Sequence, residues 1–140
     1  MMLVLPLFTG LVLAPAVAAF AMLTGFDRER AFYPLQLILF ALLYILFAAI
    51  AGGGSLLLAE MPGLLLFGAA AVIGFRTSLW IVVAGLFCHG LFDAVHGALI
   101  INPGVPGWWP AFCGGYDVTA ALCLAFGLRR DRPAAVLKNC

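Results

Sequence analysis

A succession of long apolar stretches, separated by short polar breaks, constrains this chain more than any other feature. Of its 140 residues, 66% are hydrophobic and only 9% are charged, and the mean hydropathy is +1.19. Soluble domains are about one quarter charged, and a small soluble fold cannot bury this much apolar surface. The sequence therefore predicts an integral membrane protein whose first partner is the lipid bilayer.

Five stretches have the length of about 20 residues that a helix needs to cross a bilayer. The breaks between them contain charges, glycines or prolines, and the latter two end helices. Pro62 and Gly63 make the third stretch the least regular, so a short helix starting at Pro62 is an alternative there. We expect an all-α integral membrane fold, a single domain built as a five-transmembrane-helix bundle. The predicted spans are residues 2–23, 33–51, 56–75, 78–101 and 111–128, followed by a tail over 129–140.

The N-terminal stretch MMLVLPLFTGLVLAPAVAAF ends in small residues similar to a signal-peptidase site. A secretory signal peptide begins with positive charge, but no Lys or Arg precedes the apolar run here. We therefore expect this stretch to be a retained transmembrane helix.

All the cationic side chains fall on one side of a five-span arrangement. Cytoplasmic loops are enriched in Lys and Arg, so this distribution predicts an N-terminus outside and a C-terminus in the cytoplasm. On the same basis, Trp108 and Trp109 are expected at the outer membrane interface and Trp80 at the inner one. The cations are Arg28, Arg30, Arg76, Arg129, Arg130, Arg132 and Lys138.

Within the fourth span, the stretch CHGLFDAVHG places ionisable groups in an apolar run. His89, Asp93 and His96 are spaced i, i+4 and i+7, so they line one face of a helix. At about 1.5 Å of rise per residue, Asp93 and His96 lie roughly 12 Å and 8 Å inside the outer end of their span. Acidic residues of the third and fifth spans fall at similar depth, which predicts a pocket in the outer half of the bundle. The expected lining is His89, Asp93, His96, Asp117 and Glu60, with Cys113, Tyr116 and Asn102 in support.

Three carboxylates with no Lys or Arg beside them cannot all stay charged in a layer of low dielectric constant. One interpretation is a purely structural cluster that hydrogen-bonds neighbouring helices. A second is a site for a divalent metal, zinc or iron, which includes the possibility of a membrane metalloenzyme. A third is a proton or cation pathway of a transporter or channel, running from Glu60 towards His89, with Gln36 and Tyr44 of the second span as the candidates to complete it.

A non-catalytic role is a further interpretation, because glycines distributed along the spans allow close helix packing. The chain would then be an accessory subunit of a larger membrane complex, or a homo-oligomer. The sequence leaves enzyme, transporter and accessory subunit open.

Several other classes are excluded. There is no basic patch for nucleic acid, no Gly-rich loop for a nucleotide, and no Cys-x-x-Cys pair for redox chemistry. Haem is not expected, because His89 and His96 lie on one face of one helix and cannot ligate opposite sides of a porphyrin. The combination of FDRERAFYP, HGLFDAVHG and NPGVPGWWPAFCGGYD looks like small bacterial membrane proteins. That resemblance implies the bacterial inner membrane and no particular activity.

Overall fold

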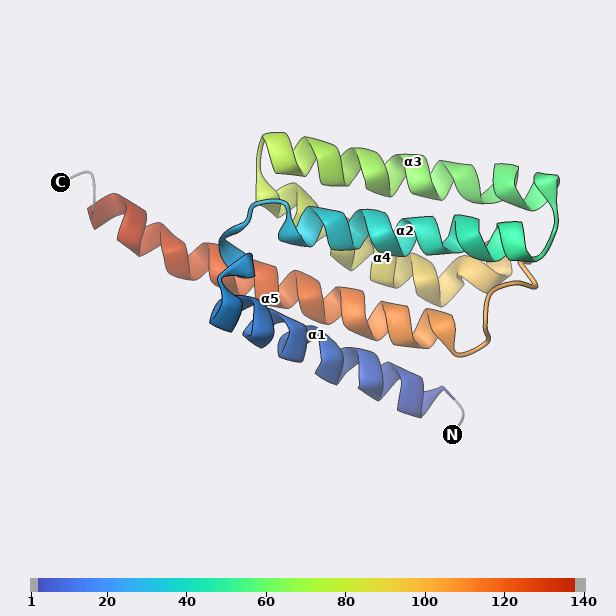
Figure 1. Ribbon diagram of the computed structural model, residues 1–140, viewed down its shortest axis with the longest axis horizontal. Coiled ribbons are helices and arrows are strands. Elements are labelled where there is room, and N and C mark those ends of the chain that lie inside the picture. Colours follow the sequence, from blue (N-terminus) through green and yellow to red (C-terminus); the bar gives the residue numbers. More distant parts are fainter. Residues whose placement is uncertain (1–2, 138–140) are drawn as a thin grey trace.

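The computed structural model describes the backbone of residues 3–137 and the side chains of residues 3–130. This part of the chain is all-helical, with five long helices and one short 3-10 turn (Figure 1). All five helices are long and apolar enough to cross a membrane, which confirms the expected helical bundle and its number of candidate spans. The elements are α1 (Val4–Thr24), η1 (Phe26–Arg28), α2 (Phe32–Ile50), α3 (Gly54–Arg76), α4 (Leu79–Leu99) and α5 (Trp109–Leu137).

The structure decides between the two alternatives for the third stretch and lengthens the fifth helix. α3 runs unbroken from Gly54 with Pro62 inside it, so the alternative of a short helix starting at Pro62 is wrong. A proline removes one backbone hydrogen bond, but helices in membranes tolerate that loss where neighbouring groups compensate for it. α5 continues as a helix to Leu137, beyond the expected end of the fifth span at Leu128.

Two turns use glycine in the left-handed conformation. Gly25, with φ 83°, ends α1, and Gly52, with φ 79°, follows α2. Glycine adopts this conformation without steric cost, and it is the usual residue at the end of a helix. These turns reverse the chain, and successive helices run in opposite directions (Figure 1).

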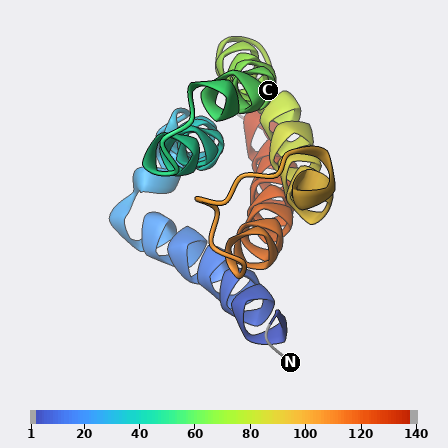
Figure 2. The same cartoon turned by 90° about the vertical axis from the view of Figure 1, so that its right-hand side faces the viewer.

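α5 lies between α1 and α4, and α3 lies between α4 and α2, while α2 also contacts α4 and α5. Figure 2 shows this arrangement end-on, with the α4–α5 connection crossing the end of the bundle. Two close approaches depend on glycine. A Cβ at Gly10 would clash with the carbonyl oxygen of Phe112, and one at Gly90 would lie 3.0 Å from that of Gly114. The second approach brings α4 and α5 together at the level of the polar residues.

Large apolar side chains cover the outside of the bundle. On α4, Phe87, Leu91, Val95 and Leu99 are exposed, whereas the histidines on the other face are buried. An apolar exterior of this kind is suited to lipid.

We predict that Gly10→Ala lowers the free energy of unfolding by about 1–3 kcal/mol, because the added methyl group overpacks the α1–α5 contact. Gly97→Ala is the matched control, since a Cβ at Gly97 meets nothing within 4 Å. The control gains helix propensity, up to about 1 kcal/mol. Thermal unfolding of both variants in one detergent measures the difference in their stability. Equal melting temperatures would contradict the close α1–α5 contact at Gly10.

Candidate metal centre

α4 supplies the core of the site. His89, Asp93 and His96 are 0%, 1% and 2% exposed, because the face they share is turned towards the other helices. The residues brought to them by other elements are buried as well. Glu60 of α3 is 3% exposed and Asp117 of α5 is 0% exposed. Ionisable side chains are therefore fully enclosed in an apolar bundle.

One part of the site, here called the His89 group, consists of His89, Asp93, Cys113 and Asp117. His89 Nδ1 lies 2.6 Å from Asp117 Oδ2 and 3.6 Å from Asp93 Oδ2. The Cys113 thiol donates to Asp117 Oδ2 at 3.5 Å. One candidate ligand atom from each of the four residues lies within 4.8 Å of all the others. The sequence expectation that Asp93 and Asp117 meet is therefore reproduced in the structure.

A second part, here called the His96 group, consists of Glu60, His96 and Asn102. His96 Nε2 lies 3.0 Å and 3.1 Å from the two Glu60 oxygens. The Asn102 amide donates to Glu60 Oε1 at 2.9 Å, and its carbonyl accepts from the Gly104 N–H at 3.0 Å. Asn102 lies in the α4–α5 connection, so this connection is tied directly to the polar interior.

Tyr44 of α2 joins the two groups. Its hydroxyl donates to Asp93 Oδ1 at 2.5 Å, and its ring centroid lies 4.2 Å from that of His96. Sequence reasoning named Tyr44, with Gln36, only as a candidate to complete a proton pathway and did not place it among the pocket residues. Its position on the α2 face that also buries Leu37, Ala41 and Ala48 is the signal that could have placed it there.

The structure separates the expected lining residues into two clusters. His89, Asp93 and Asp117 come together, while Glu60 and His96 pair with each other. Cys113 and Asn102, expected in supporting positions, belong to the His89 group and the His96 group respectively. Tyr116 belongs to neither, because its hydroxyl donates to Gln36 at 3.0 Å on another part of the α2–α5 contact.

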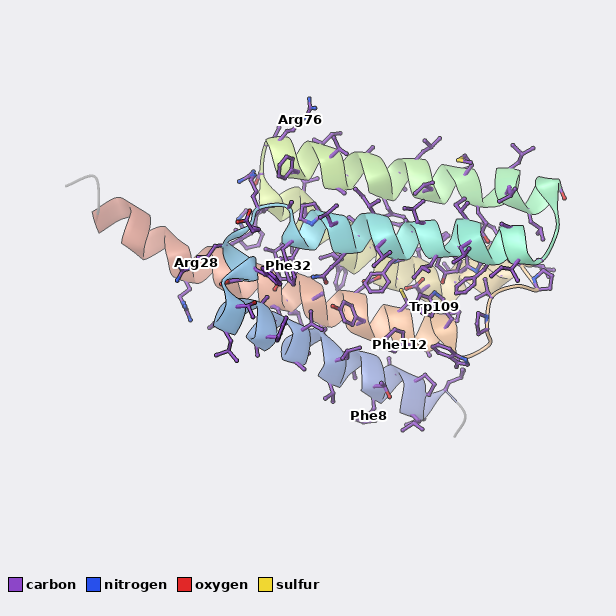
Figure 3. All side chains as sticks on the ribbon, in the orientation of Figure 1. Phe8, Arg28, Phe32, Arg76, Trp109 and Phe112 are labelled. Atoms are coloured by element: carbon purple, nitrogen blue, oxygen red, sulfur yellow. The ribbon has the colours of Figure 1, made fainter. Side chains whose placement is uncertain are left out.

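Several polar atoms in the His89 group lack a hydrogen-bond partner within the described residues. They are His89 Nε2, Asp93 Oδ2 and Asp117 Oδ1. Buried polar atoms are nearly always hydrogen-bonded, and an exception indicates an absent ligand, ion or water. None of the described Arg side chains belongs to either group. Figure 3 shows Arg28 and Arg76 at one end of the bundle, with the α2–α3 turn and the α4–α5 connection at the other end.

The donor set of the His89 group fits a divalent metal. Zinc binds imidazole, carboxylate and thiolate at about 2.0–2.3 Å, which places the ligand atoms of a tetrahedral site about 3.3–3.8 Å apart. The separation of 3.6 Å between His89 and Asp93 and that of 3.5 Å between Cys113 and Asp117 fall in this range, and the four donor atoms together lie within 4.8 Å of one another. A bound metal would therefore draw the more distant donors inward. The 2.6 Å contact between His89 and Asp117 is a hydrogen bond, so a bound metal would displace its proton.

Comparison of the chain with protein-family models, with curated proteins and with solved structures found no match. The function proposed below is inferred from the contacts of the two groups themselves. Chemically, these contacts can hold a cation, position protons between carboxylates and imidazoles, or fix the helices relative to one another.

Removing the hydrogen bond from the Tyr44 hydroxyl to Asp93 should destabilise the bundle. We predict that Tyr44→Phe costs about 1–3 kcal/mol, because it leaves the buried Asp93 carboxylate without its donor. Tyr116→Phe removes a hydroxyl of the same kind from the partly buried Gln36 bond and should cost about 0.5–1.5 kcal/mol. Thermal unfolding of the two variants compares them, and a larger loss in Tyr116→Phe would argue against a central role for the Tyr44 bond.

Proposed function

We propose that this chain is an integral membrane protein that binds one divalent metal ion, zinc or iron, in the His89 group. The observation that carries the proposal is the convergence of four ligand atoms from fully buried residues within 4.8 Å. Two of these residues, Asp93 and Asp117, also present a carboxylate oxygen without a hydrogen-bond partner among the described residues. Hydrogen bonds alone do not account for those oxygens.

Charge supports the same proposal. Carboxylates in an apolar bundle are costly unless a cation or a hydrogen-bond donor compensates for them. The described Arg side chains are at residues 28, 30, 76, 129 and 130, none of which belongs to either polar group. A divalent cation would supply the missing positive charge, and the Cys113 thiol would lose its proton on binding, as metal-bound cysteines do.

The number of donors favours a metal that links helices over one that catalyses a reaction. Four protein ligands fill a tetrahedral zinc site, whereas a catalytic zinc keeps one position for water or substrate. All four donors come from α4 and α5, so the ion would cross-link this helix pair. A metalloenzyme is the alternative function. It would require one of the four donors to leave the metal so that water or substrate could bind there.

A second candidate function is a proton or cation pathway, and the Tyr44 hydroxyl between the two groups is the observation that favours it. A relay would run from Glu60 and His96, past Tyr44 and Asp93, to His89 and Asp117. A cavity of about 10 Å³ borders Tyr44, Glu60 and His89, which is close to the space that one water molecule needs. Proton flux into liposomes that Glu60→Gln abolishes, without bound metal, would favour this candidate.

The membrane orientation is also part of the proposal. We place the N-terminus outside, the C-terminus in the cytoplasm and the chain in the bacterial inner membrane, as a monomer, a homo-oligomer or a subunit of a larger complex. The support is that Arg28 and Arg76, from different helices, lie at one end of the bundle (Figure 3), as the enrichment of cations in cytoplasmic loops requires. The two polar groups then lie towards the outer leaflet.

We predict that the purified protein, stripped with a chelator and reloaded with zinc, binds one ion per chain. Cys113→Ala should lose it because the substitution removes a donor atom, and Asp117→Asn should lose it because a neutral amide replaces the charged carboxylate that zinc prefers. Cys88→Ala is the matched control, since Cys88 is exposed on α4 and outside the site. Elemental analysis of the detergent-solubilised variants gives the number of zinc ions bound per chain. Zinc retained by all three variants, or by none including the wild type, would contradict a metal site in the His89 group.

We also predict that a cysteine at Gly107, in the exposed α4–α5 connection, reacts with an impermeant thiol reagent added to intact cells. A cysteine at Thr77, at the arginine end, should react only after the membrane is opened. The background replaces the other native cysteines and keeps Cys113, which is fully buried. Reaction at Thr77 from outside would reverse the proposed orientation.

A further inference from the structure

A separate cavity lies at the arginine end of the bundle, away from both polar groups. Its volume is about 470 Å³, within the range of about 300–1,000 Å³ found for small-molecule sites. It exists because η1 separates α1 from α2, and these two helices make no direct backbone contact in the described chain. α1, η1, α2, α5 and the start of α4 contribute its walls.

The walls of this cavity are amphipathic. Its apolar lining comes mainly from α1 and α5 and includes the buried Ala18 and Leu124 and the exposed Met22 and Phe126. Charged residues line it at the level of η1 and the end of the predicted fifth span, including Arg28 and Arg130. From Cys123 to Arg130 the lining of α5 extends about 10 Å along the helix. That length suits a headgroup, its linker and the first carbons of an apolar chain.

Arg28 and Arg130 are the lining arginines that are available for a ligand. Arg30 also lines the cavity, but its guanidinium donates to the carbonyl oxygens of Gly74, Phe75 and Thr77 at the end of α3. The lining carries three arginines, Arg28, Arg30 and Arg130, against two acids, Asp27 and Glu29, so its formal charge is +1. This net positive charge favours an anionic ligand over a zwitterionic one.

We propose that this cavity binds an anionic glycerophospholipid from the leaflet at the arginine end. Its phosphate would lie against Arg28 and Arg130, and the beginning of its acyl chains against Met22 and Phe126. Basic pockets between transmembrane helices are suited to such headgroups, and the planar guanidinium matches a phosphate in two-point geometry. A water-soluble anion would make no use of the apolar wall, and an apolar partner helix would leave the net positive charge of the lining uncompensated.

The test uses the full chain in detergent with equal amounts of phosphatidylglycerol and phosphatidylcholine, and native mass spectrometry to count bound lipid. We expect about one phosphatidylglycerol per chain. The Arg28→Gln, Arg130→Gln double variant should bind it about tenfold more weakly or worse, since each cation near a membrane surface contributes measurably to anionic lipid binding. The control is Arg76→Gln, Arg129→Gln, which removes the same charge from the same end outside the cavity lining and should retain the lipid.

Alkylation of Cys123 provides an independent measurement, because this thiol lines the cavity. Peptide mass spectrometry should show that phosphatidylglycerol protects Cys123, whereas phosphatidylcholine and inorganic phosphate do not. Equal lipid loss in both double variants, with melting temperatures unchanged, would overturn the proposal by indicating general surface charge. Protection by phosphate alone would overturn it in favour of a free anion site, and a dimer without bound lipid would assign the cavity to a second copy of the chain.

Discussion

The burial of ionisable side chains among apolar helices, with none of the described Arg side chains beside them, is the constraint on which the site depends. Such groups must be paired with one another or with an external cation, because an isolated charge in a medium of low dielectric constant is very costly. The 2.6 Å contact between His89 and Asp117 satisfies part of this requirement and joins α4 to α5. It is possible only because Gly90 and Gly114 let the two backbones approach closely. One oxygen each of Asp93 and Asp117 has no hydrogen-bond partner among the residues that the structure describes, so part of this requirement remains to be met.

The bundle has two chemically different ends, and α5 extends between them. Near its start, Cys113 and Asp117 belong to the His89 group, and further along Cys123 and Arg130 line the amphipathic cavity. The arginines at one end are suited to anionic headgroups, while the carboxylates towards the other are suited to a cation. Only 9% of residues are charged. The described arginines lie together at one end of the bundle with Asp27 and Glu29, whereas Glu60, Asp93 and Asp117 lie away from them.

Sequence reasoning reached the helical architecture and much of the site. The apolar runs indicated the number of candidate spans, and the i, i+4, i+7 spacing identified the buried face of α4, because both follow from helix geometry alone. The division into two groups depends on which helix lies beside which, and spacing within one helix does not contain that information. Tyr116 illustrates the limit: it neighbours Asp117 in sequence, but adjacent helical residues point about 100° apart, so only one of them faces His89.

X-ray absorption at the zinc edge of the reloaded protein tests the central claim most directly, because it reports the atoms bound to the metal. A site formed by His89, Asp93, Cys113 and Asp117 should give one sulfur neighbour at about 2.3 Å and three nitrogen or oxygen neighbours at about 2.0–2.2 Å. The sulfur neighbour should disappear in Cys113→Ser. A shell of oxygen and nitrogen alone in the wild-type protein, unchanged by that substitution, would contradict a metal centre between α4 and α5.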